Sequence, residues 1–167
     1  NIKPLKINDS TFYMKEMNEK IIFASHPDVH ITLAPKREHE GATYHFEKLA
    51  KGVKTPAEYL KNNEYEKALA GYLAIQQRDS LDRNIRERTL NSLGYRAIRN
   101  KKHQKAIHIF KINIALYPTS SNTYDSLGEA YWELKDTINA VASYKKALSI
   151  NQENRRAIRF LKRHKLN

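Results

Sequence analysis

The chain has 167 residues, 40% of them hydrophobic, with five glycines and five prolines, a composition typical of a globular protein. It contains no cysteine, which excludes disulfides, a thiol nucleophile and a cysteine-ligated metal. No apolar stretch approaches the roughly 20 residues that span a bilayer, so no membrane span is predicted. Thirty Lys and Arg against 18 Asp and Glu give a net charge of +12, but the excess is spread along the chain, which favours solvated helix faces over nucleic-acid binding.

The segment 1–54 is predicted to form a small antiparallel sheet. Apolar and polar residues alternate over 29–33 and 44–46, as in strands with one buried face. Two earlier strands are expected at 11–15 and 20–24, and turn-forming residues separate the four segments. A four-stranded sheet of this size is marginal alone, so we expect its apolar face to pack on the helices that follow and cap their near end.

Residues 55–167 are predicted to form a separate helical domain. A short helix is expected to begin near residue 55, because Thr55 can cap the first amides, Pro56 suits the first helical position and Glu58 can bond back to the cap. The later helices are expected at 64–78, 83–99, 103–116, 121–134, 137–149 and 154–164. Their candidate N-caps are Asp82, Ser120, Ser121 and Asn154.

A pattern with a fixed period runs through this helical part. The sequence Leu93-Gly94 is followed by Ala106 and Phe110, and the same residue types recur one period later as Leu127-Gly128, Ala140 and Tyr144. The period is about 34 residues, the length typical of stacked helix–turn–helix units. The pattern resembles the tetratricopeptide (TPR) family, which implies a surface for partners rather than a catalytic centre.

The glycines of this pattern predict close helix contacts. We expect Gly94 and Gly128 where the two helices of each hairpin approach most closely, facing alanines of the second helix. The aromatic residues Phe110 and Tyr144 are expected to fill space toward the neighbouring hairpin. A degraded third unit is expected upstream of these two, with an insertion of one helical turn that we assign to a longer helix at 83–99. The residues that mark this third unit are Ala68, Tyr72 and Ile75.

The last predicted helix would cap the far end of the array. Ile158 and Leu161 are expected to face inward and its basic side chains outward. The basic side chains are Arg155, Arg156, Arg159, Lys162 and Arg163.

Several segments resemble the region that follows the catalytic domain in bacterial serine hydrolases of the β-lactamase and penicillin-binding-protein-like family. They are Ser10–Tyr13, Glu40–Phe46, Lys54–Pro56, Leu90–Tyr95 and Tyr124–Tyr131. The resemblance implies an accessory C-terminal region whose catalytic domain is absent from this chain, and a periplasmic or extracytoplasmic location. A similar tail follows α/β-hydrolase esterases, which leaves the identity of the enzyme open. Because residue 1 is Asn and no signal-peptide pattern is present, we expect a piece of a longer protein.

No catalytic residue, metal site or cofactor is predicted for this chain. Ser143 begins a Ser-x-x-Lys sequence, the nucleophile motif of that hydrolase family, but the next residue, Tyr144, is a repeat-core position and no companion motif is present. Four histidines lack a partner at metal-ligand spacing and are expected to be solvated. They are His26, His30, His39 and His45.

The candidate site is the concave face formed by the first helices of the two better units. If the groove positions of the TPR family carry over, the first unit offers Arg88, Asn91, Tyr95, Ile98 and Arg99. The second unit offers Asn122, Asp125, Glu129, Trp132 and Glu133. Trp132 has two interpretations: an anchor for a basic or extended peptide, or packing against the terminal helix or the sheet.

Other TPR proteins clamp acidic chaperone tails with lysine and asparagine at groove positions. Tyr95 and Glu129 stand where the asparagine is expected, which disfavours that ligand. The sequence therefore predicts an α+β fold and a non-catalytic accessory region. Its partner would be a protein, a peptide or the missing catalytic domain of the same polypeptide. The alternative is a free-standing TPR adaptor that binds a peptide in its groove.

Overall fold

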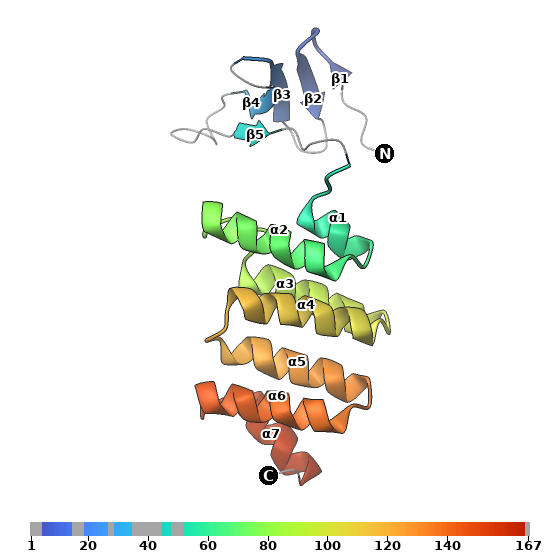
Figure 1. The fold of residues 1–167 in the computed structure, drawn as a ribbon, viewed down its shortest axis with the longest axis vertical. Coiled ribbons are helices and arrows are strands. Elements are labelled where there is room, and N and C mark those ends of the chain that lie inside the picture. The colour runs from blue at the N-terminus through green and yellow to red at the C-terminus, as the bar shows by residue number, and fades with distance from the viewer. Residues whose placement is uncertain (1–4, 15–18, 27–28, 35–44, 48–51, 166–167) are drawn as a thin grey trace. The chain divides into compact units, whose positions relative to one another are not determined.

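A computed structural model describes residues 5–14, 19–26, 29–34, 45–47 and 52–165 (Figure 1). The chain divides into two compact units, residues 1–53 and 54–167. The first is a small antiparallel sheet and the second an array of helical hairpins, as the sequence predicts. None of the helices in the described ranges is long and apolar enough to cross a membrane.

The sheet of the N-terminal unit is a meander in which each strand pairs with its neighbours in sequence. Its strands are β1 (Leu5–Lys6), β2 (Thr11–Met14), β3 (Glu19–Ala24), β4 (His30–Leu33) and β5 (His45–Glu47). The four expected strands are present. The edge strand β1 is additional, and it is too short to show an alternating pattern. The expected turn at 36–41 and the strand position Tyr44 lie outside the described residues.

None of the sheet side chains that the structure describes is fully buried. Phe12 and Phe23 meet edge to face across β2 and β3 with ring centroids 5.4 Å apart, yet Phe23 remains 46% exposed. The buried core residues of the described chain all belong to the helical unit. The expected packing of the sheet on the helices stays a prediction.

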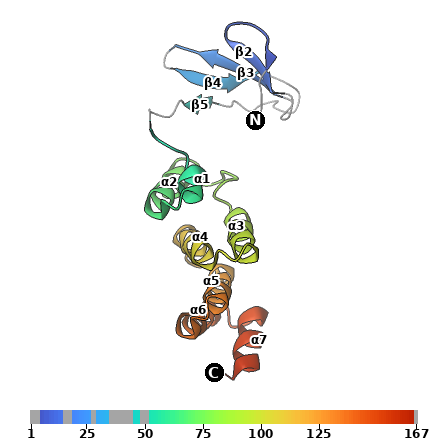
Figure 2. The ribbon, with the colours of Figure 1, turned by 90° about the vertical axis from the view of Figure 1, so that its right-hand side faces the viewer.

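The helical unit contains three hairpins and a terminal helix (Figures 1 and 2). The helices are α1 (Pro56–Lys61), α2 (Tyr65–Arg78), α3 (Glu87–Arg99), α4 (His103–Leu116), α5 (Ser121–Glu133), α6 (Thr137–Ile150) and α7 (Arg155–His164). Helices α1 and α2, α3 and α4, and α5 and α6 pair as hairpins, while α4 packs on α5 and α6 on α7. The array therefore continues from one hairpin to the next.

A turn of the same length joins the helices of each hairpin. In each turn one residue adopts left-handed backbone geometry: Asn63 (φ 64°), Lys101 (φ 57°) and Lys135 (φ 67°). Asparagine tolerates this conformation better than lysine, so the two lysines carry a backbone cost that the turn imposes. Because Lys101 and Lys135 are one repeat period apart, the repeat extends to the turns.

Two of the predicted N-caps are confirmed. Thr55 and Glu58 form a reciprocal capping box at α1, and Asn154 Oδ1 accepts the Ala157 amide at 3.0 Å at the start of α7. Ser120 occupies the N-cap position of α5 but its side chain makes no capping bond. The expected cap at Asp82 is wrong, because no helix begins there.

The helix predicted at 83–99 begins one turn late, at Glu87. The side chains of Asp79 and Asp82 accept the amides of Leu81 (2.9 Å) and Asn84 (2.7 Å), and these local bonds compete with a helix. Helices α3 and α5 are equally long, at 13 residues each, so the insertion lies in the connection between hairpins. Within that connection Ile85 is fully buried in the core.

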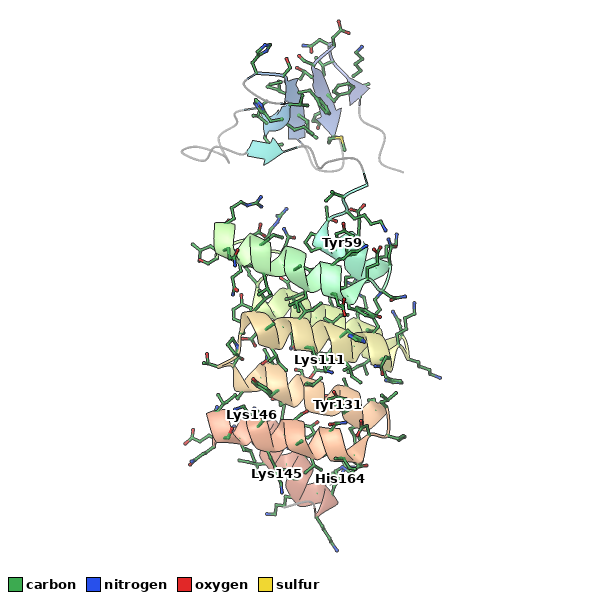
Figure 3. All side chains as sticks on the ribbon, in the orientation of Figure 1. Tyr59, Lys111, Tyr131, Lys145, Lys146 and His164 are labelled. Carbon is green, nitrogen blue, oxygen red and sulfur yellow. The ribbon has the colours of Figure 1, made fainter. Side chains whose placement is uncertain are left out.

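Each glycine of the repeat faces the second helix of its hairpin, where an aromatic ring and not an alanine covers it. A Cβ on Gly94 would meet the Phe110 ring, and a Cβ on Gly128 would meet the Tyr144 ring. Phe110 therefore meets Gly94 and Tyr95 within its own hairpin, whereas the sequence predicted space toward the next one. Tyr144 covers Gly128 and also stacks on Phe160 of the next helix, α7, so the prediction is right in part for this ring. The residue after Phe110 on α4, Lys111, has its Nζ 6.0 Å from the Tyr131 ring centroid and helps to join α4 to α5 (Figure 3).

Candidate functional site

The predicted groove residues lie on α3 and α5, which contact each other. Their helical spacing places each set along one side of its helix. Arg88, Arg99 and Glu133 are exposed. Asn91, Tyr95, Glu129 and Trp132 are half-buried, and Asp125 is only 2% exposed. We call the side of the array formed by α3, α5 and α7 the A-helix face; α3 and α7 lie on one side of the row of α4 and α6 (Figure 2).

Tyr95, Asp125 and Glu129 come together at the centre of this face, and we call these three residues the polar notch. The Tyr95 hydroxyl donates to Glu129 Oε2 at 3.0 Å and lies 3.1 Å from Ser126 Oγ. The carboxylate of Asp125 lies one turn before Glu129 on α5. The notch therefore joins α3 to α5 through hydrogen bonds and presents two carboxylates side by side.

A guanidinium from the terminal helix occupies the polar notch. Arg156 Nη2 donates to Tyr95 Oη and to Glu129 Oε2, and Nη1 lies 3.3 Å from Asp125 Oδ1. The guanidinium carbon is 5.4 Å from the centroid of the Tyr95 ring, within cation–π range. The expectation that Arg156 points outward is wrong, because two carboxylates and a hydroxyl offer it a better environment than solvent on the far side.

Asn154 completes the surroundings of the notch. Its Nδ2 donates to Asp125 Oδ2 at 3.0 Å and to Ser121 Oγ at 3.2 Å, while its Oδ1 caps α7. Neither Asn154 nor Arg156 was among the predicted site residues. The repeat could have indicated Arg156, which lies one period after the groove position Asn122.

Burial dominates the electrostatics of the notch. Burial raises the pKa of the Asp125 carboxyl above its ordinary value, while the hydrogen bond from Asn154 and the charge of Arg156 act in the opposite direction. Burial also raises the pKa of the Tyr95 hydroxyl, against the bond with Ser126 and the bond from Arg156. Tyr95 is therefore protonated at neutral pH and can donate to Glu129.

Trp132 packs against the terminal helix, one of its two expected interpretations. Its ring centroid lies 4.9 Å from that of Phe160, in an edge-to-face contact, and 4.3 Å from that of His164. Phe160 also stacks on Tyr144 at 4.0 Å. Trp132 therefore helps to hold α7 in place and borders the A-helix face next to that helix.

The inward side of α7 differs from the expected one. Ala157 and Leu161 are buried, but Ile158 is 43% exposed. Ala157, Leu161 and the half-buried Phe160 and His164 share one side of the helix, and Ile158 lies away from their centre. The prediction was right for Leu161 and wrong for Ile158.

Two further groove positions, Asn122 and Asn91, differ in their hydrogen bonding. Asn122 Nδ2 donates to Glu87 Oε1 at 2.6 Å, which links α5 to the first residue of α3. Asn91 Oδ1 is buried and accepts no hydrogen bond within the described part of the chain. Among those same residues, Arg88, Arg99 and Glu133 form no ion pair and border the notch on α3 and α5.

Ser143, the residue considered as a nucleophile, is engaged within its own helix. Ser143 is buried, and its hydroxyl donates to the Asn139 carbonyl of its own helix at 2.7 Å, so it has no general base. No cluster of three or more possible ligands for a metal occurs in the ranges that the structure covers. His39 and the side chain of His45 lie outside these ranges.

Comparison with known proteins supports the repeat. Residues 121–154, which comprise α5, α6 and the turn to Asn154, match the family model described as a tetratricopeptide repeat. The hairpin of α5 and α6 is thus a TPR unit, and the helical part of the chain is a TPR-like array. No curated protein matches the chain in sequence.

Several solved structures are similar to this chain, all at low identity. The TPR domain of Sgt2 from Aspergillus fumigatus is 20% identical over 66% of this chain and 72% of that one, with a TM-score of 0.46. The first TPR domain of human RPAP3 is 20% identical over 65% and 82%, with a TM-score of 0.45. A crystal structure of MamA is 17% identical over 68% and 86%, with a TM-score of 0.44. The resemblance to serine-hydrolase tails is not shown by these comparisons.

Proposed function

We propose that the helical unit is a non-catalytic interaction module that binds an extended segment of a protein partner along the A-helix face. The observation that carries this proposal is the polar notch. A TPR hairpin is stabilised by small and aromatic side chains, and a buried carboxylate such as Asp125 costs free energy unless it is paired. In this chain Arg156 pairs with the charge and is itself 44% exposed, so the notch lies where a polar group of a partner can reach it.

The surroundings of the notch are suited to an extended ligand. Arg88 and Arg99 lie on α3 on either side of Tyr95 and are exposed, and Glu133 is exposed one turn after Glu129 on α5. A ligand that runs along this face meets charged side chains at its borders and the notch at its centre. The residues that we propose as contacts are Arg88, Asn91, Tyr95, Arg99, Asp125, Glu129, Trp132 and Glu133.

A selection from a random peptide library with the full chain as bait tests this function. We expect peptides whose affinity falls at least about 10-fold when Arg88 and Arg99 are both changed to alanine, because arginines in an interface often contribute more than about 1 kcal/mol to binding. The matched control removes two exposed basic residues elsewhere, Arg78 on α2 and Lys145 on α6 (Figure 3). Equal losses in both double variants, or no loss in the first, would refute the A-helix face as the binding surface.

A second candidate is that the partner is a catalytic domain of the same polypeptide. The sequence segments that resemble serine-hydrolase tails favour it, since they come from both units of the chain, for example Glu40–Phe46 and Tyr124–Tyr131. This function places the protein outside the cytoplasm. The gene sequence upstream of Asn1 tests it: a Ser-x-x-Lys and a Lys-Thr-Gly-like triplet are expected there, and an upstream sequence without either would remove this candidate.

A further inference from the structure

The polar notch has the chemistry of a site for a guanidinium group. A planar guanidinium presents several N–H donors in a fixed fork, and the notch offers Tyr95 Oη, Glu129 Oε2 and Asp125 Oδ1 as acceptors around one position. The Tyr95 ring adds a π face at 5.4 Å from the bound guanidinium carbon. A lysine ammonium is a compact point charge and cannot match this arrangement of acceptors.

Two bonds that hold the notch together do not involve its present occupant. Tyr95 and Glu129 are joined by their own hydrogen bond, and Asn154 holds Asp125 Oδ2 at 3.0 Å. Asp125 Oδ1 is buried without a hydrogen bond in the described chain, and the guanidinium nitrogen at 3.3 Å is its ion-pair partner. The side chain of Asp125 is only 3% exposed, so this oxygen points into a site that requires a cation.

The present occupant can leave while its helix stays in place. The side chain of Arg156 is 44% exposed, so a rotation about its side-chain bonds carries the guanidinium into solvent. Helix α7 keeps its other attachments, namely the buried Ala157 and Leu161, the bond from Asn154 to Asp125 and the contact of Phe160 with Trp132. Arg156 is therefore a replaceable ligand attached to the protein itself.

We propose that the polar notch recognises an arginine side chain of the partner and that Arg156 occupies the notch when no partner is bound. This inference rests on the proposed function and specifies the chemistry of the partner at the centre of the A-helix face. Because the two guanidinium groups compete for one site, the apparent affinity for the partner is reduced by the fraction of time that the notch is open. Removal of Arg156 then strengthens binding of an external arginine, the opposite of what is expected if Arg156 itself contacts the partner.

Short peptides test the notch directly. The probes are acetyl-Ala-Arg-Ala-amide and acetyl-Ala-Lys-Ala-amide, titrated by NMR into the full chain, its Arg156→Ala variant and the double variant Arg156→Ala/Glu129→Gln. We expect the arginine probe to bind the Arg156→Ala variant about 10-fold more tightly than it binds the unmodified chain. We also expect it to bind this variant about 10-fold more tightly than the lysine probe does. The added Glu129→Gln change is expected to abolish this gain. An arginine probe that binds Arg156→Ala no better than it binds the unmodified chain, or no better than the lysine probe does, would overturn the proposal.

Two controls make the outcome specific. Circular dichroism and the emission of Trp132 establish that α7 remains docked, and Arg156→Gln, which keeps part of the side-chain stem, replaces Arg156→Ala if the latter does not fold. The tripeptide test compares variants at Arg156 and Glu129 and leaves Arg88 and Arg99 unchanged. If the library peptides bind equally well without Arg88 and Arg99, the proposed function is refuted but the arginine-recognition proposal is not. If the tripeptide test fails, only the proposal that the notch recognises arginine is refuted.

Discussion

Gly94 lies directly against the ring of Phe110, so closely that a Cβ on Gly94 would stand 2.3 Å from Phe110 Cε1. Phe110 is fully buried and also meets Tyr95 edge to face, with ring centroids 5.4 Å apart. The corresponding pair in the next hairpin is looser, since a Cβ on Gly128 would stand 2.9 Å from Tyr144 Cδ2. The two glycines of the repeat thus have the same role, but Gly128 leaves more room for an added methyl group than Gly94 does.

Gly94→Ala is expected to destabilise the protein more than Gly128→Ala. Alanine gains up to about 1 kcal/mol over glycine in a helix, while overpacking costs about 1–3 kcal/mol. At Gly94 the buried ring must move, and we expect a net loss of about 1–2 kcal/mol. At Gly128 a small shift of Tyr144 suffices, so the net change is expected to be near zero. Urea unfolding of both variants measures the difference, and equal stabilities would contradict this packing.

Ile85→Ala is expected to cost about 2–4 kcal/mol although the residue lies outside any helix. Ile85 is fully buried in the connection between α2 and α3, and removal of such a side chain leaves a cavity. Leu81, in the same connection, is 82% exposed, so Leu81→Ala is a matched control with an expected change below about 0.5 kcal/mol. Similar unfolding midpoints in urea for the two variants would show that the connection does not contribute to the core.

The sequence predicted the fold well where the pattern is long and periodic. The interval between Leu93-Gly94 and Leu127-Gly128 located both hairpins, and Thr55 and Asn154 were correctly assigned as caps. Position 83 was wrongly assigned to a helix, because the turn bonds of Asp79 and Asp82 compete with the helix and the burial of Ile85 depends on tertiary contacts. Helical periodicity alone cannot predict these turn bonds and tertiary contacts.

Glu64 is expected to give the protein part of its acid sensitivity. Lys54 Nζ and Lys67 Nζ lie 2.5 Å and 2.9 Å from its carboxylate oxygens, and these bonds lower its pKa from 4.5 to about 2. A carboxyl with a lowered folded-state pKa stabilises the fold above its unfolded pKa, and this contribution is lost as the pH falls from 4.5 toward 2.

We therefore expect Glu64→Gln to lower the melting temperature at neutral pH and to match the unmodified chain near pH 2. Thermal melts across this pH range measure the difference. Glu66→Gln, which removes an exposed carboxylate of the same helix α2, controls for the change in charge. A deficit of Glu64→Gln that is the same at both ends of the range would contradict the assigned role of the two lysines.

Phe160→Ala is expected to loosen α7 without unfolding the hairpins. Phe160 contacts Trp132, Tyr144 and His164, and because it is half-buried we expect a cost of about 1–2 kcal/mol, less than for a fully buried phenylalanine. Trp132 is the single tryptophan of the chain, so its emission is expected to shift to the red. Amide exchange is expected to rise in α7 alone; unchanged emission, or faster exchange throughout α3–α6, would contradict this role.

The candidate site was only partly predictable. The groove positions of the TPR family predicted that Tyr95, Asp125 and Glu129 share one face. In the structure these three residues come together and form the polar notch. The role of Arg156 was missed because the amphipathic pattern of α7 suggested that all its basic residues face solvent. A buried carboxylate on a neighbouring helix outweighs that pattern, and the distance between two helices cannot be read from the sequence.

Mapping a bound peptide on the full chain tests the central claim most directly. With a library-selected peptide, we expect the largest changes in amide chemical shift at Tyr95, Asp125, Glu129 and Arg156, and small changes on α4 and α6. Shifts concentrated on α4 and α6, with the notch residues unchanged at saturation, would contradict binding along the A-helix face.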